Sequence, residues 1–150
     1  MSASLSGGTT ATPNILAHNF ATALSGKMED AKVNSNVQTI LAATQSYPAT
    51  GSIAGLIFYD KIQVQLKDGS HTFNGNAGGI GTPGGGALIG DVYTSDLNKL
   101  VTETTSFAFT GTPVYFAVYF FDKNHNNLGS FQAGAVSTVL GTGGGSGSWG

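Results

Sequence analysis

A chain of 150 residues is long enough for one domain with its own hydrophobic core and short for two. Hydrophobic residues make up 40%, which excludes a simply disordered protein, whereas charged residues make up only 9%, against about 25% in an average globular protein. All six basic residues are Lys and the formal net charge is −2, so the Arg-rich basic surface of most nucleic-acid-binding proteins is missing. We expect no nucleic-acid partner.

Small uncharged residues must therefore supply the surface. The chain has 23 Gly, 17 Thr, 14 Ser and 10 Asn. Cysteine is absent, which excludes disulfides, thiolate catalysis and cysteine-ligated metals. Residues 1–10 contain neither the basic nor the apolar region of a signal peptide, so we expect either a cytosolic protein or a mature form with an added Met1.

The N-terminal residues predict a tail followed by a short helix. Residues 1–11 contain a single Leu, and so few apolar groups cannot offset the entropy of ordering the chain. Thr12 and Pro13 resemble a helix start, and Gly26 resembles a stop. A short helix over 14–25 is the prediction.

We expect residues 1–33 to form a flexible N-terminal segment that includes this helix, and residues 34–150 to form a β-barrel core. A first strand is predicted from about Val37 to Pro48, because alternating side chains precede a residue that cannot donate to a ladder. Residues 53–66 alternate in hydrophobicity, and we interpret them as one long strand with a bend near Asp60 and Lys61.

A hairpin is predicted next. Asp68-Gly69 is the typical signal of a two-residue type I′ turn, and residues 71–73 would be the returning strand. A glycine-rich segment at 75–86 separates this strand from another over 87–93.

The remaining segments continue the pattern. Thr94, Ser95 and Asp96 offer capping side chains for one short helix. Further strands are predicted at 104–110, at 114–121, which is apolar on both faces, and at 128–140 with a turn cluster at 122–127 before it. The end of the chain, 141–150, has the composition of a tag or linker, although Trp149 could dock.

About eight β segments at turn spacings of about ten residues indicate an antiparallel barrel or sandwich. A closed barrel removes the exposed strand edges that charged residues would otherwise protect. We therefore predict an all-β fold, a closed eight-stranded antiparallel β-barrel with Greek-key-like connections and one short helix.

Dinucleotide and phosphate motifs are not supported. Residues 79–84 match G-x-G-x-x-G, but a strand pattern follows them where the dinucleotide fingerprint requires a helix. The glycines of 141–148 have no Lys after them, as a phosphate-binding loop would require.

The His and Asp residues favour structural roles in turns over metal binding or acid–base catalysis. His18, His71 and His125 fall in a helix, a strand and a turn, with no zinc-binding spacing. Asp68 and Asp122 each precede a His by three residues, and we expect both carboxylates to cap backbone amides.

Asp122, Asn124 and Asn126 resemble the start of a calcium loop, but Asn127 replaces its glycine and Ala133 its closing Glu. We therefore predict no catalytic residue, no cofactor and no metal site, and we expect the protein not to be an enzyme.

Aromatic residues cluster in one predicted strand, at Tyr115, Phe116, Tyr119, Phe120 and Phe121. They could form a patch for a ligand or membrane, or they could fill the interior of a glycine-rich barrel. We favour the second interpretation.

Residues 90–100, residues 119–131 and the glycine-rich terminus with Trp149 resemble the virulence-associated proteins of Rhodococcus equi, the Vap family. The resemblance covers about residues 34–150. It implies a small secreted protein with a variable N-terminal segment and an eight-stranded antiparallel barrel with one short helix. It also implies a part in bacterial persistence inside macrophages through altered endolysosomal compartments, with no catalytic residues to transfer.

Two functional hypotheses follow. The first is a secreted, non-enzymatic virulence-associated effector that acts at a host endolysosomal membrane or on another host component. The alternative is a barrel that binds a small ligand or a carbohydrate, in its mouth or on exposed aromatic residues. We expect a monomer with a host membrane or host protein as its partner, located outside the bacterium or on its surface.

Overall fold

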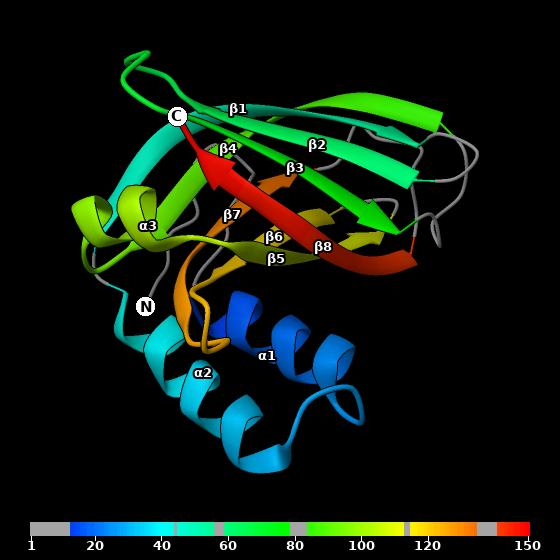
Figure 1. Cartoon of the computed structure of the whole chain (residues 1–150), viewed down its shortest axis with the longest axis vertical. Helices are drawn as coiled ribbons and strands as arrows, with labels where there is room; N and C mark the ends of the chain where they lie inside the picture. Colours follow the sequence, from blue (N-terminus) through cyan, green and yellow to red (C-terminus); the bar gives the residue numbers. More distant parts are fainter. Residues whose placement is uncertain (1–12, 44, 56–58, 79–83, 113–114, 135–140) are drawn as a thin grey trace.

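Eight antiparallel strands close into a barrel in the computed structural model, which describes residues 13–43, 45–55, 59–78, 84–112, 115–134 and 141–150 (Figure 1). The strands are β1 (Gln45–Gly55), β2 (Tyr59–Leu66), β3 (Thr72–Gly78), β4 (Gly84–Thr94), β5 (Ser106–Thr112), β6 (Tyr115–Phe121), β7 (Asn127–Gly134) and β8 (Gly141–Trp149). The helices in this part of the chain are α1 (Pro13–Leu24), α2 (Asp30–Ala42) and α3 (Leu97–Glu103).

The strand order around the barrel is β1-β2-β3-β8-β5-β6-β7-β4. Strand β4 lies between β1 and β7, and β8 lies between β3 and β5, so both pair with strands distant in the sequence. The predicted closed eight-stranded antiparallel barrel is confirmed. The one short helix expected in the barrel is α3, and the described residues also contain α1, predicted over 14–25, and α2, which was not predicted.

The prediction of a first strand from about Val37 was wrong for residues 37–42, because these residues belong to helix α2. The first strand, β1, begins at Gln45. The buried residues of α2 are Val33, Asn36 and Ile40, spaced three and four apart as on one helix face. Asp30 stands in the first helical turn, where a negative charge interacts favourably with the helix dipole. The domain boundary placed after residue 33 falls inside this helix.

The predicted long strand over 53–66 is two strands that form a hairpin. Ile53 pairs with Ile62, and Gly55 pairs with Asp60. The buried positions change from odd to even between Ile53 and Ile62, and this change of phase marks the turn that simple alternation had hidden.

The β2–β3 hairpin is confirmed, but its two-residue type I′ turn is not. Leu66 donates its backbone N–H to the carbonyl of His71 at 3.0 Å, so the loop comprises residues 67–70. Gly69 has a φ of 79°, and the Asp68 carboxylate accepts the Ser70 N–H at 2.8 Å. The loop therefore needs a left-handed glycine at one position only.

The glycine-rich end of the chain is a strand, β8, that closes the barrel; it is not a linker. A Cβ on Gly147 would lie 2.5 Å from the Phe73 ring and 2.6 Å from the carbonyl oxygen of Asn74. Trp149 ends the strand inside the barrel, with its ring 5.2 Å from that of Phe120. Glycine is required here because aromatic rings occupy the space of a side chain.

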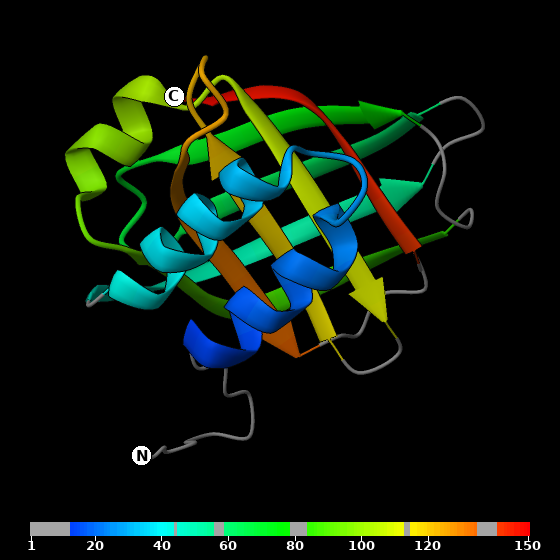
Figure 2. The same ribbon diagram turned by 90° about the horizontal axis from the view of Figure 1, so that it is seen from below.

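Two separate hydrophobic clusters result. One fills the barrel, and the other lies outside it, between β6 and the α1–α2 hairpin, which Figure 2 shows crossing the barrel wall. The outer cluster contains Leu16, Ala17, Phe20, Val33, Ile40, Ala108, Tyr115, Ala117, Tyr119 and Phe121. Strand β6 is therefore apolar on both faces, as predicted, because each face is covered.

Two smaller predictions are also confirmed. Helix α1 matches the helix predicted over 14–25, and α3 begins after Asp96, whose carboxylate accepts the Lys99 N–H at 3.0 Å. The predicted flexible tail at 1–11 and most of the glycine-rich motif at 79–84 lie outside the described residues.

We predict that Gly147→Val lowers the free energy of unfolding by about 3 kcal/mol, because its side chain must displace the Phe73 ring and the neighbouring strand. Ser148→Val, at the next, exposed position of β8, is the matched control and should be near neutral. Urea unfolding followed by circular dichroism measures both. Equal stability of the two variants would contradict the packing argument.

Candidate functional site

Aromatic rings fill the interior of the barrel. Phe107, Phe109, Phe116 and Phe120 are at most 3% exposed and belong to the inner cluster. The rings of Phe109 and Phe116 stack with centroids 5.6 Å apart. This packing confirms that rings fill the glycine-rich barrel, and it argues against a ligand inside it.

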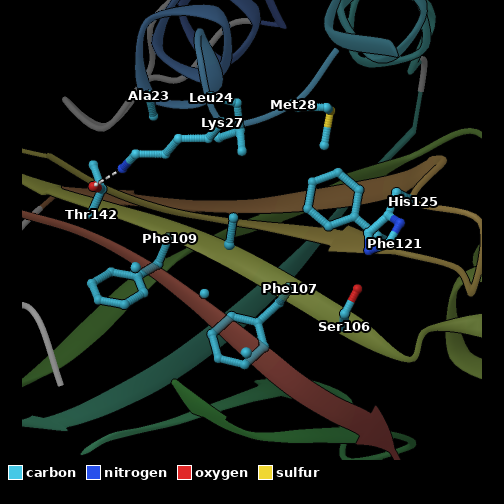
Figure 3. Close-up of a pocket in the computed structure, with 14 residues that line it drawn as sticks. Ala23, Leu24, Lys27, Met28, Ser106, Phe107, Phe109, Phe121, His125 and Thr142 are labelled. Carbon is cyan, nitrogen blue, oxygen red and sulfur yellow. Dashed lines mark hydrogen bonds between the residues drawn. The ribbon is translucent and has the colours of Figure 1, made fainter. Parts of the chain in front are cut away.

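A groove of about 500 Å³ lies instead on the outer surface, between the end of α1 and the β5–β8 pair (Figure 3). Leu24, Met28 and Phe121 give it apolar walls, and Lys27 and His125 add the two titratable groups of its lining. Its volume is within the range of about 300 to 1,000 Å³ that is typical of small-molecule sites.

The position of Lys27 depends on the turn that ends α1. Gly26 has a φ of 81°, which glycine adopts without strain, and Lys27 donates its N–H to the Leu24 carbonyl at 3.0 Å. The chain thereby turns back over the sheet, and the Lys27 ammonium donates to the Thr142 hydroxyl at 3.1 Å (Figure 3).

Small residues make the floor of the groove. Ala108 of β5 pairs with Gly144 of β8, and Ser106 lies on the same face as Ala108. The backbone amides of these strands are used in ladders with neighbours on both sides. The floor therefore provides space and shape, and few free hydrogen-bonding groups.

The β6–β7 turn holds His125 at the groove. His125 has a φ of 62°, which is uncommon for a residue other than glycine. The buried side chain of Asn36 donates to the His125 carbonyl at 3.0 Å and accepts the Asn127 N–H at 2.9 Å. Helix α2 thus fixes this turn through one amide group.

The carboxylate of Asp122 supports the same turn. It accepts the N–H groups of Asn124 and Asn126 at 2.8 and 2.9 Å. Burial raises the pKa of this carboxyl, but the hydrogen bonds from Asn126 and Asn124 outweigh it and hold the pKa below its ordinary value. The expected capping roles of Asp68 and Asp122 are both confirmed.

The sequence-predicted histidines stay apart. His18 lies on α1, His71 at the β2–β3 loop and His125 in the β6–β7 turn. Among the described residues, no three His, Asp or Glu side chains are grouped so that they could hold a metal ion. Of the three histidines, the structure brings only His125 to the groove.

Sequence reasoning missed Lys27, Met28 and Asn36. Gly26 was recognised as a helix stop, but nothing local indicates which strands the following residues face. Asn36 lies on the same helix face as the apolar residues Val33 and Ile40. A polar side chain in such a position needs a hydrogen-bond partner in the interior, and this pattern could have indicated its role.

The family model of the Rhodococcus equi virulence-associated protein matches residues 4–150. The chain belongs to this family. The predicted resemblance to the Vap proteins is therefore confirmed, and the match extends beyond residues 34–150 into the N-terminal segment.

Two solved Vap structures are similar to this chain. The virulence-associated protein VapB from the intracellular pathogen Rhodococcus equi is 42% identical, with a TM-score of 0.66 over 71% of this chain and 96% of that one. VapD from the same organism is 34% identical, with a TM-score of 0.67 over 71% of this chain and 97% of that one. A search of curated protein sequences found no match.

We predict that Asn36→Ala destabilises the protein by about 2 to 4 kcal/mol, because the buried Asn127 N–H and the His125 carbonyl both lose their partner. Ser35→Ala, on the exposed side of α2, should change the free energy of unfolding by less than about 0.5 kcal/mol. Thermal unfolding of both variants tests this. A neutral Asn36→Ala would show that the amide does not hold the turn.

The hydrogen bonds of the Asp122 carboxylate predict that the free energy of unfolding depends on pH. Because the folded pKa of this carboxyl lies below its ordinary value, its charge stabilises the protein at neutral pH. That contribution should be lost as the pH falls from about 4 through the folded pKa. The stability difference between wild type and Asp122→Asn should therefore shrink on acidification.

Urea unfolding at neutral pH and at several acidic values measures this difference. Glu103→Gln, at the exposed end of α3, is the control for loss of one negative charge. A difference that grew on acidification would contradict the assigned role of Asp122.

Proposed function

We propose that the protein is a secreted, non-enzymatic virulence-associated effector that acts at a host endolysosomal membrane or on another host component. Membership of the Vap family supports the association with virulence. The filled interior supports a role for the outer surface, because rings occupy the space where a barrel would otherwise enclose a ligand. The proposed location is outside the bacterium or on its surface, and the proposed acting form is a monomer.

The observation that carries the membrane proposal is the scarcity of fixed charge. With six Lys against eight carboxylates, the formal net charge at pH 7 is only −2, and the isoelectric point of the sequence is about 5.8. Below that pH the net charge is positive, so acidification favours contact with anionic lipid.

A second supporting feature is the uncovered side of the barrel. The α1–α2 hairpin covers β6, whereas none of the described helices covers the outer face of β2 and β3 (Figures 1 and 2). This face and the adjoining end of β8 carry mostly exposed neutral groups, with Lys61 as one charged group among them. The neutral side chains are Gln63, Gln65, Asn74, Asn76, Ser146 and Ser148. The Gln63 amide donates to the Asn74 amide oxygen at 3.1 Å. A surface with so little charge is only weakly repelled by a lipid surface of either charge.

None of the described helices has the length and apolar character needed to cross a membrane.

We predict that the protein co-sediments with anionic vesicles increasingly as the pH falls from about 7.5 to about 4.5, because the pH then passes below the isoelectric point of about 5.8 and the net charge becomes positive. Phosphatidylcholine vesicles with and without phosphatidylserine are the two lipid conditions. A salt concentration of about 1 M should remove the acid-dependent increase by screening and keep any binding that depends on apolar area.

Absence of binding at every pH and to both lipids would overturn the membrane version of the proposal. An acid-dependent increase that persists unchanged at high salt would show that the net charge does not drive it. In that second case the acid-dependent mechanism would be wrong.

A further inference from the structure

We propose that the groove between α1 and the β5–β8 pair binds a single-chain anionic amphiphile, namely a free long-chain fatty acid. The alkyl chain would lie against Leu24, Met28 and Phe121, and the carboxylate would contact Lys27. This site goes beyond the membrane proposal and does not depend on it.

The charge of the groove favours an anion. Acidic residues outnumber basic ones in the chain, eight to six, yet the described lining contains Lys27 and no Asp or Glu, and Glu29 lines the adjoining hollow instead. Lys27 is exposed, and its ammonium donates to a neutral hydroxyl, that of Thr142. An ammonium group has three donors, so a carboxylate can join or replace this contact as the stronger, charge-assisted partner.

The shape of the groove favours an alkyl chain. Its walls are aliphatic, thioether and aromatic, and Met28 is flexible enough to adapt to a chain of varying curvature. Its floor of Ala108 and Gly144 is flat because neither residue projects beyond a methyl group. Figure 3 shows the Lys27 side chain extending across the groove, with Met28 and Leu24 above the sheet.

Other ligand classes fit less well. A sugar needs several hydrogen-bonding groups, and of the four polar side chains in the lining Lys27 and Thr142 already bond to each other, which leaves Ser106 and His125 for its hydroxyls. An extended peptide that added a strand would need a free sheet edge, but the floor is the face of a closed barrel. An apolar tail with one anionic head group matches the apolar walls and the Lys27 ammonium of the groove.

The test uses oleate below its aggregation concentration as the probe, with isothermal titration on the whole chain. We expect Lys27→Gln to weaken oleate binding about tenfold and to leave binding of oleyl alcohol unchanged, because only the carboxylate contacts the ammonium. Lys61→Gln, exposed on β2 and away from the groove, removes the same charge and should bind oleate as wild type does.

A second variant tests the apolar part. Ala108→Met fills the floor of the groove and should weaken both oleate and oleyl alcohol at least tenfold. Near-ultraviolet circular dichroism, which reports the packing of Phe121, Tyr115 and Tyr119, shows whether this variant keeps its hairpin in place. If Ala108→Met displaces the hairpin, Ser106→Val at the edge of the same floor is the smaller substitution to use.

Wild type that does not bind oleate, or an equal loss in Lys27→Gln and Lys61→Gln, would overturn the proposal. Vesicle co-sedimentation separates this result from the membrane proposal. Oleate binding without vesicle binding would support the groove alone, whereas vesicle binding unaffected by Lys27→Gln and Ala108→Met, with no oleate binding, would reject the groove and leave the membrane function standing.

Discussion

The packing of aromatic rings against glycines is the constraint on which the barrel depends. Phe73 and Phe107 occupy the space that a side chain on Gly75 would need, and Phe73 does the same at Gly147. Each of these rings is packed inside the barrel only because the facing position has no side chain. The glycine-rich composition is therefore part of the core, because the missing side chains make room for the rings.

The same packing explains why the surface has so little charge. A closed barrel has no free strand edge to protect, and the inner cluster of the described residues consists of hydrophobic side chains. Uncharged side chains then cover most of the outer face of β2 and β3, with Lys61 as an exception. At the groove, Lys27 adds a positive charge to a lining that is otherwise made mostly of apolar and small residues.

The sequence predicted the closed barrel because alternation and turn signals are local and recur along the chain. It did not predict α2, because Val37 and Leu41 fit a strand period as well as a helix period over a short window. It did not predict β8, because glycine has low β propensity and only the distant rings require it. The groove was also hidden, since Leu24, Ala108 and Gly144 come together through pairings that no local pattern shows.

Strand β6 contributes to both hydrophobic clusters, which gives the α1–α2 hairpin a protective role. Its inner face carries Phe116, Val118 and Phe120, and its outer face carries Tyr115, Ala117, Tyr119 and Phe121. Tyr119 ties the two parts together by donating its hydroxyl to the Leu16 carbonyl at 3.2 Å. If the hairpin were removed, β6 would present three aromatic side chains and Ala117 to water, and such an apolar patch promotes self-association. The helices thus keep an aromatic barrel wall soluble.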